Sequence, residues 1–481
     1  MNVKAISRNV GYALLVSALF MFLSVIVSMA NGNDSALAAL SISFVITFIV
    51  GVFPFIFVRK TTAITLKDGY MIITLAWLLS FIFGMLPYAM WGGPFSLVNA
   101  WFESVSGFTT TGSTILDNVE TLPRSLLFWR ASTHFIGGLG VVVFLLLIIP
   151  NDTQMRMRLS NMELSSMIRE GYSLRANKSV YIFAIVYIVL AVAAFVAYLI
   201  AGMAPFDAIC HAFSVCATGG FSTRAASIGA FDSRAVEIVT LVFMLLSSIH
   251  FGQLYISVAT RSLRPLRNPV VKTYLASIAV ITVLVFVIFR VAGNGVTLWQ
   301  SLFQTVCVTS TSGFAVVDNA SWPLSANAIL LLAAIVCGCS GSTSGGIKCD
   351  RFLLILKSVG RQMGSILHPS AVNEIRLGDR MLKDEDVAPQ LLYVELYFLV
   401  LAVSVVLSIM CGVNGTESLA ASITSLSNVG PAFGDLGTMA SYNSIPTMAK
   451  LVCTLDMFLG RVEIYPLLAV CGLIFARKSG K

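Results

Sequence analysis

FESVSGFTTTGSTIL (102–116) is one of four segments in which a moderately apolar stretch runs into hydroxyl-bearing residues and glycine. The other three are CHAFSVCATGGFSTR (210–224), FQTVCVTSTSGFAVV (303–317) and ITSLSNVGPAFGDLG (423–437). Each apolar stretch spans about a dozen residues, which is too few to cross a bilayer. We align the four segments on Gly112, Gly219, Gly313 and Gly430, so the sequence predicts an internal fourfold repeat.

The composition predicts that these segments lie in a membrane. Hydrophobic residues make up 57% of the 481 positions and charged residues 11%, whereas a soluble domain carries roughly 25% charged residues. Runs of about 20 apolar residues are long enough to cross the hydrocarbon core. We expect ten spans, the first an uncleaved helix rather than a secretory signal, at residues 11–31, 37–58, 69–91, 126–150, 179–202, 235–260, 271–293, 325–358, 388–412 and 446–476.

The charged loops predict an orientation. Basic residues are concentrated in alternate loops, at Lys4, Arg8, Arg59, Lys60, Lys67, Arg156, Arg158, Arg169, Arg175, Lys178, Arg261, Arg264, Arg267, Lys272, Arg477, Lys478 and Lys481. The intervening loops carry the acids Glu103, Asp117, Glu120, Asp207, Asp232, Asp318, Glu417 and Asp435. This positive-inside pattern predicts that both termini are cytoplasmic and that the acidic loops face outward, where they concentrate cations. The positive-inside distribution of the basic residues accounts for the net charge of +8, so we expect no nucleic-acid partner.

The repeated segments predict a cation filter made of backbone oxygens. A dehydrated alkali cation needs a cage of oxygens, which a ring of carbonyls from four extended loops can supply. Irregular backbone persists at membrane depth only where it lines a cavity or is buried in protein, and glycine permits the positive φ that turns carbonyls toward one axis. A single T-x-G would more readily indicate helix packing. Four copies, each between two spans, favour a shared pore.

The residues of these segments identify a family. FESVSGFTTTGSTIL, HAFSVCATGGFST (211–223), SGSTSGGIK (340–348) and SNVGPAFG (427–434) resemble the TrkH/TrkG branch of the Trk/Ktr/HKT superfamily of potassium uptake proteins, over almost the whole chain. The resemblance implies an all-α polytopic membrane protein with four pseudo-symmetric helix–pore loop–helix repeats around a central pore, plus two N-terminal transmembrane helices. We expect an N-terminal extension (1–62) and repeats at 63–160, 161–262, 263–386 and 387–481, the third with a long interrupted second helix.

The same resemblance implies the surroundings of the chain. It implies a homodimer in the bacterial cytoplasmic (inner) membrane, regulated by a cytoplasmic TrkA-like ring of nucleotide-binding RCK-type subunits. Potassium is then the one ligand of this chain, and any nucleotide belongs to the partner. The simplest interpretation of the charged stretch 359–387 is a solvated surface. The resemblance to the family instead implies that this stretch is the docking face for the regulatory ring.

The filter residues are carried over from the family. Backbone oxygens that would face the ion belong to Thr110, Thr111, Ala217, Thr218, Thr311, Ser312, Asn428 and Val429, and the glycines Gly112, Gly219, Gly313 and Gly430 would shape the turns. In plant relatives selective for sodium the first glycine is a serine, so Gly112 favours potassium. The pair Ala432-Phe433 departs from the smaller residues of the family, which predicts an altered outer vestibule.

A glycine- and serine-rich run interrupts the long span 325–358. Such a run cannot stay a stable helix in lipid unless neighbours satisfy its backbone. It is either a tightly packed kink or a flexible loop across the pore beneath the filter, and the resemblance favours the second. The gating residues would be Gly341, Ser342, Thr343, Ser344, Gly345, Gly346 and Lys348.

Arg461 lies inside the last predicted span. A charge at bilayer depth costs several kcal/mol unless it is paired or hydrated. Glu463 or nearby carbonyls could neutralise Arg461, but we prefer a role as an electrostatic barrier in the permeation path, where it helps to hold the closed loop.

Two other functions are less consistent with the sequence. A sodium- or proton-coupled potassium symporter would normally need a titratable group near the membrane centre, and apart from Glu463 the spans offer almost none. An enzyme should show a polar constellation such as H-E-x-x-H, which the sequence lacks. The nine cysteines lie mostly in apolar runs and are expected to be buried free thiols. Passive permeation is therefore the preferred interpretation.

Overall fold

The computed structural model describes residues 2–58, 65–148, 176–293, 295–368, 374–377, 380–382 and 384–478. The expected repeat boundaries at 62/63 and 160/161 lie outside the described residues, as do Arg59, Lys60, Arg156, Arg158, Arg169, Arg175 and Lys481. The regular structure of the described part is helical, as expected, except for one hairpin of β1 (Ile375–Leu377) and β2 (Arg380–Leu382). The hairpin lies within the stretch 359–387, of which residues 369–373, 378–379 and 383 are also not described.

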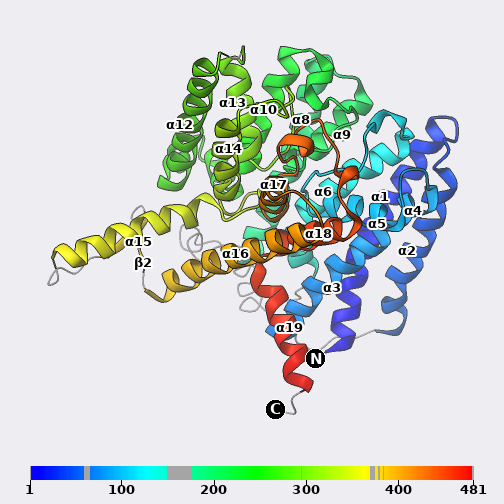
Figure 1. The fold of residues 1–481 in the computed structure, drawn as a ribbon. Coiled ribbons are helices and arrows are strands. Elements are labelled where there is room, and N and C mark those ends of the chain that lie inside the picture. The colour runs from blue at the N-terminus through cyan, green and yellow to red at the C-terminus, as the bar shows by residue number, and fades with distance from the viewer. Residues whose placement is uncertain are drawn as a thin grey trace.

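Long apolar helices form most of the molecule (Figure 1). They are α1 (Val3–Ala30), α2 (Leu37–Phe57), α3 (Leu66–Gly84) continued by α4 (Leu86–Trp91), α6 (Arg124–Ile148), α8 (Ala176–Ile200), α12 (Pro269–Val291) and α16 (Asp384–Met410). By length and composition, six helices of the described part could cross a membrane, and a bent pair would make a seventh. Exposed apolar side chains along α2, α8, α12 and α16, such as Phe53, Val192, Val283 and Leu399, suit contact with hydrocarbon.

Four short helices, the pore helices, repeat between pairs of longer ones. They are α5 (Leu97–Phe108), α9 (Pro205–Cys216), α13 (Leu298–Thr309) and α17 (Gly415–Leu426), each of 12 residues. Local sequence explains where they begin, because Ser96 caps α5, Pro205 occupies the first turn of α9, and Thr297 forms a capping box with Gln300 in α13. The predicted helix–pore loop–helix repeats are therefore present.

The helices that follow the second, third and fourth pore helices are broken. After α9, α10 (Arg234–Ser248) and α11 (Phe251–Ala259) meet at 102°. After α13, α14 (Leu324–Val336) and α15 (Cys349–Leu367) are separated by a loop, as predicted. After α17, α18 (Thr447–Val462) and α19 (Ile464–Lys478) are separated by Glu463, which has a left-handed φ of 60°. The continuous spans expected over 235–260 and 446–476 are therefore wrong, because the backbone turns sharply within each.

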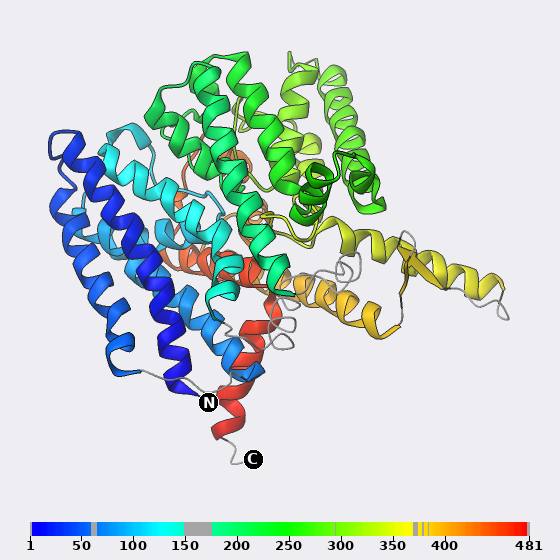
Figure 2. The same cartoon turned by 180° about the vertical axis from the view of Figure 1, so that it is seen from behind.

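The repeats surround a common centre, and the N-terminal pair packs on one side. α1 packs against α2, α3 and α6, and α1 and α2 form the edge farthest from α15 in both views (Figures 1 and 2). The ends of α15 and α16 project together from the body, and both chain termini lie at one end of the molecule. We call that end the terminal side.

Glycine allows α1 and α2 to approach closely. A Cβ added at Gly11 would lie 2.7 Å from the carbonyl oxygen of Gly51 and 3.0 Å from the Phe55 ring. A Cβ at Gly51 would lie 3.2 Å from the Leu15 side chain. Small residues at such crossings let helix backbones meet in a membrane.

We expect Gly11→Leu to destabilise the protein by about 1–3 kcal/mol, because the added side chain must separate α1 from α2. The melting temperature of detergent-solubilised protein measures this. Gly360→Leu is the matched control, since nothing lies within 4 Å of a Cβ at that position of α15. An equal loss of melting temperature in both variants would contradict the packing argument.

Candidate functional site

The four pore helices end in the same backbone conformation. Two residues beyond each helix, a non-glycine residue has a left-handed φ, at Thr110 (54°), Thr218 (53°), Thr311 (59°) and Asn428 (55°). The next residue donates its N–H to the fifth residue before it, as Thr111 does to Ser106 O at 3.0 Å and Val429 to Thr424 O at 2.9 Å. Both features belong to the Schellman ending of a helix. The residue after that is a glycine with positive φ in every repeat, at Gly112 (84°), Gly220 (85°), Gly313 (69°) and Gly430 (92°).

This geometry corrects the alignment of the second segment by one residue. Gly220, not Gly219, is the counterpart of Gly112, whereas Gly219 corresponds to Thr111. Ala217 is the C-cap of α9, so it corresponds to Thr109, one residue before the aligned positions. The segment contains two consecutive glycines, and only their φ angles show which of them makes the turn.

The four loops close into a ring. A Cβ at Gly112 would collide with Gly219 O, one at Gly220 with Ser312 O, one at Gly313 would lie 2.6 Å from Val429 O, and one at Gly430 would collide with Thr111 O. Each glycine therefore packs against a carbonyl of the next loop, and the fourth loop packs against the first. We call residues 110–112, 218–220, 311–313 and 428–430 the loop ring. The loop ring contains all the filter residues predicted from the sequence except Ala217, which comes immediately before it. It also contains Gly220, which was not predicted.

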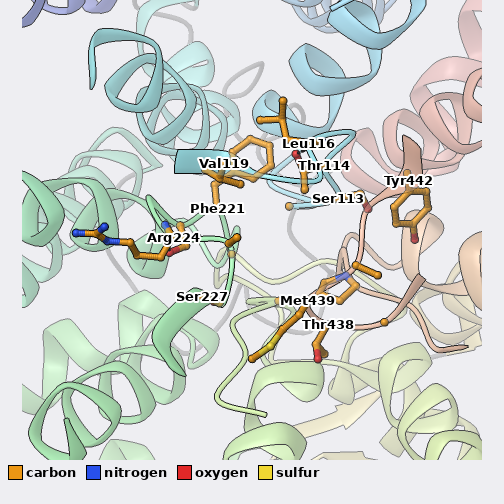
Figure 3. A pocket seen from close by; sticks show the side chains of 18 of the residues that line it. Ser113, Thr114, Leu116, Val119, Phe221, Arg224, Ser227, Thr438, Met439 and Tyr442 are labelled. Atoms are coloured by element: carbon orange, nitrogen blue, oxygen red, sulfur yellow. Dashed lines mark hydrogen bonds between the residues drawn. The ribbon is translucent and has the colours of Figure 1, made fainter. Parts of the chain in front are cut away.

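A cavity of about 60 Å³, the vestibule, opens on one side of the loop ring. Its floor includes Gly112, Gly220, Gly313 and Pro431. Its walls come from residues that follow the ring in three of the loops, among them Thr114, Phe221 and Met439 (Figure 3). The pair Ala432-Phe433, expected to alter the vestibule, is buried and does not line it.

Buried hydrogen bonds support the loop ring. Asn428 Nδ2 donates to Thr111 Oγ1 at 3.0 Å and to Met457 O at 2.9 Å. Gly430 O accepts from Ser113 Oγ at 3.0 Å and from Tyr442 OH at 3.1 Å. These bonds join the fourth loop to the first, so the ring is supported by partners far apart in the sequence.

The loop between α14 and α15 lies against the ring on the side opposite the vestibule. Gly345 N donates to Thr311 Oγ1 at 3.1 Å, and a Cβ at Gly345 would collide with Ser427 O. Thr343 Oγ1 lies 3.1 Å from Cys216 O and 3.2 Å from Ser247 O. We call residues 338–348 the crossing loop, because it touches the ends of the second, third and fourth pore segments.

Arg461 joins the crossing loop to the first repeat. Its Nη1 donates to Thr343 O at 2.7 Å and its Nη2 to Gly137 O at 2.9 Å. Glu463 instead pairs with Arg351 at 2.9 Å and with Lys348 at 3.5 Å. Of the two neutralising partners considered from sequence, the carbonyls are therefore the ones that these contacts show.

Three acids are buried in places that the sequence analysis did not predict. Glu103 and Asp207 lie on pore helices and are buried, so their assignment to outward-facing loops is wrong. Asp456 is a buried carboxylate on α18, within a span expected to hold almost no titratable group, and it accepts a hydrogen bond from Ser404. A charged residue inside an apolar stretch was the available signal in all three cases.

Comparison with known proteins gives consistent matches. Residues 37–475 match the family model TrkH, described as a cation transport protein. The Trk system potassium uptake protein TrkH of Escherichia coli (strain K12) is 32% identical, and the match covers 99% of this chain and 100% of that protein. TrkG of the same strain is 30% identical over 99% of both chains. The crystal structure of the potassium transporter TrkH from Vibrio parahaemolyticus superposes with a TM-score of 0.87 and 30% identity, over 97% of this chain and 98% of that one.

Proposed function

Since this chain belongs to the TrkH family of cation transport proteins, as the resemblance predicted, we propose that it takes up potassium ions through the loop ring. Its relatives are transport proteins rather than enzymes. The observation that carries the proposal is the closed ring itself, in which four repeats bring the same glycine against the same carbonyl of the next repeat.

In this proposal the ion is held by main-chain oxygens. The carbonyls of the ring replace the hydration shell of potassium. The C-terminal ends of the four pore helices, which carry partial negative charge, point at the ring and favour a cation there. With the corrected register, the contributing carbonyls belong to Thr110, Thr111, Thr218, Gly219, Thr311, Ser312, Asn428 and Val429.

The crossing loop is proposed to act as the gate. It lies across the far side of the ring, and Arg461 holds it in place and puts a positive charge beside the path. We propose that the vestibule faces the outside of a bacterial inner membrane and that the terminal side faces the cytoplasm. The stretch 359–387 would then dock a TrkA-like regulatory ring, and the chain would form a homodimer.

Asp456 favours one alternative, a sodium- or proton-coupled symporter. It is a buried carboxylate on α18, which packs against the fourth pore helix, α17. Buried ionisable groups in membrane helices commonly mark ion or proton pathways. Asp456→Asn would abolish coupling in such a symporter and leave passive flux unchanged in a channel-like protein.

Potassium flux into proteoliposomes decides between the two. A membrane potential supplies about 2.3 kcal/mol per charge for each 100 mV, so passive uptake should follow the imposed voltage at any sodium or pH gradient. Uptake that requires an inward sodium or proton gradient would establish the symporter. Absence of cation flux, with and without a regulatory partner, would overturn both.

We expect Gly112→Ser to lower the ratio of potassium to sodium permeability. Gly112 has a φ of 84°, and an added Cβ would collide with Gly219 O. Strain of about 1–3 kcal/mol must then be relieved by moving the ring carbonyls. Reversal potentials in mixed potassium and sodium solutions measure the ratio, and Gly220→Ser should act in the same direction.

Gly92→Ser is the matched control for these variants. Gly92 has a similar φ of 81°, but nothing lies within 4 Å of its added Cβ. The control should keep the permeability ratio of the unaltered protein. Unchanged ratios in both ring variants would count against the filter assignment.

Deletion of residues 341–346 should raise the resting potassium flux, because it removes the part of the crossing loop that touches the ring. Arg461→Gln, which loses the paired bonds to Thr343 O and Gly137 O, should raise it as well. Radioactive rubidium uptake without a regulatory partner measures the resting flux. Folded variants with no flux would contradict the gate assignment.

A further inference from the structure

A buried ion pair lies beside the vestibule and outside the loop ring. Arg130 Nε on α6 is 2.6 Å from Glu103 Oε1 on the first pore helix, α5, and the two side chains are only 2% and 0% exposed. Arg130 is also among the residues that line the vestibule. A buried pair of this kind contributes little net stability, so its energetic role does not account for its place here.

The pair connects the first and second loops at equivalent positions. Glu103 accepts hydrogen bonds from Thr114 Oγ1 at 3.0 Å and from Ile115 N at 3.1 Å. Arg130 Nη2 donates to Thr114 Oγ1 and Nη1 donates to Ser222 O, both at 3.2 Å. Thr114 and Ser222 each follow the ring glycine of their loop, Gly112 or Gly220, by two residues. One guanidinium group therefore bridges the same position of two neighbouring loops.

Stacking contacts connect Arg130 to Gly219 of the second loop. The Arg130 guanidinium lies 3.9 Å from the centroid of the Phe221 ring, and Phe221 stacks on His134 at 4.1 Å. His134 in turn occupies the space where Gly219 would carry a Cβ. The contacts of Arg130 thus reach the residue whose carbonyl packs against Gly112.

At the other junctions between loops the described residues form no buried ion pair, although the exposed Asp117 of the first loop accepts hydrogen bonds from Ser441 and Asn443 of the fourth. Gly229 N donates to Ala315 O at 3.0 Å between the second and third loops. Thr438 N donates to Asn319 Oδ1 at 2.8 Å between the third and fourth. Tyr442 N donates to Thr114 O at 2.8 Å between the fourth and first. The junction of the first and second loops differs from these because its donor, Arg130 Nη1, belongs to a buried guanidinium group that is paired with a carboxylate.

We propose that Glu103 and Arg130 are positioning residues for selectivity, which fix the separation of the first two ring loops and so the size of the oxygen cage. The proposal rests on the proposed function, because it assigns a role at the same filter. Neither side chain contacts the ion. Glu103 acts through Thr114 Oγ1 and Ile115 N, and Arg130 acts through Thr114 Oγ1 and Ser222 O. Their opposite charges cancel near the path of a cation.

The test uses the neutral double variant Glu103→Gln/Arg130→Met in proteoliposomes. It has the same net charge as the unaltered protein and leaves no unpaired buried charge, so a changed ratio reports geometry rather than local potential. We expect the potassium to sodium permeability ratio to fall about tenfold, as for loss of one well-placed contact, while potassium flux persists. Arg234→Met/Glu237→Gln, which removes an ion pair whose arginine is 60% exposed on α10, is the matched control and should keep the ratio.

Each outcome bears on a separate claim. Selective flux in the unaltered protein together with an unchanged ratio in the folded double variant would overturn the positioning role. A double variant that loses flux and folded protein in equal proportion, with its ratio unchanged, would make the pair merely structural and also overturn it. Absence of selective potassium flux in the unaltered protein would instead overturn the proposed function.

The single variants give an independent measure. Glu103→Gln leaves an uncompensated positive charge beside the vestibule, which should reduce cation flux, whereas Arg130→Met leaves a negative charge, which attracts cations and should not reduce the flux through its charge. Flux differences of this sign weaken at high ionic strength, whereas a change of ratio caused by geometry persists. A ratio restored by high salt would contradict the proposal.

Discussion

Contact between a glycine and a neighbouring carbonyl, repeated four times, is the constraint on which the structure depends. The loops are not helical, so their polar backbone groups need partners other than helix hydrogen bonds, and irregular backbone of this kind persists in a membrane protein only where it is buried or lines a cavity. They remain there because each loop packs on the next and the pore helices end in a common Schellman geometry. Any side chain at these glycines would meet a carbonyl oxygen, so the ring and the small residues within it require each other.

The rest of the fold supports this ring unequally. Between the first and second loops the support includes Arg130, which is paired with the buried Glu103 of its own repeat and donates to Ser222 O. At the other junctions the described residues are joined by hydrogen bonds without a buried ion pair. On the terminal side the second, third and fourth repeats break their second helices at different places. The third break is the longest and supplies the crossing loop, which the fourth repeat holds through Arg461. A fourfold ring is thus joined to an asymmetric set of broken helices on the terminal side, an arrangement that fits the proposed gating of a shared path by one repeat.

The sequence was a good guide wherever the signal is local. Apolar runs set the helices, because a segment with so few charges has to be surrounded by lipid or protein. The repeated segments located the pore helices, and the interruption within 325–358 located the crossing loop. The continuous spans over 235–260 and 446–476 were wrong, since hydropathy does not record a left-handed residue such as Glu463 or the turn before α11.

Sequence by itself determined the membrane class, the four repeats and most residues of the loop ring, since each depends on composition and on order along the chain. Tertiary structure alone decided that Gly220 rather than Gly219 makes the second turn, because the two glycines are chemically identical and differ only in φ. It alone paired Glu103 with Arg130, 27 residues apart, and set Asp456 beside Ser404. Such choices depend on which backbones meet across the ring, and no local pattern of residues encodes that contact.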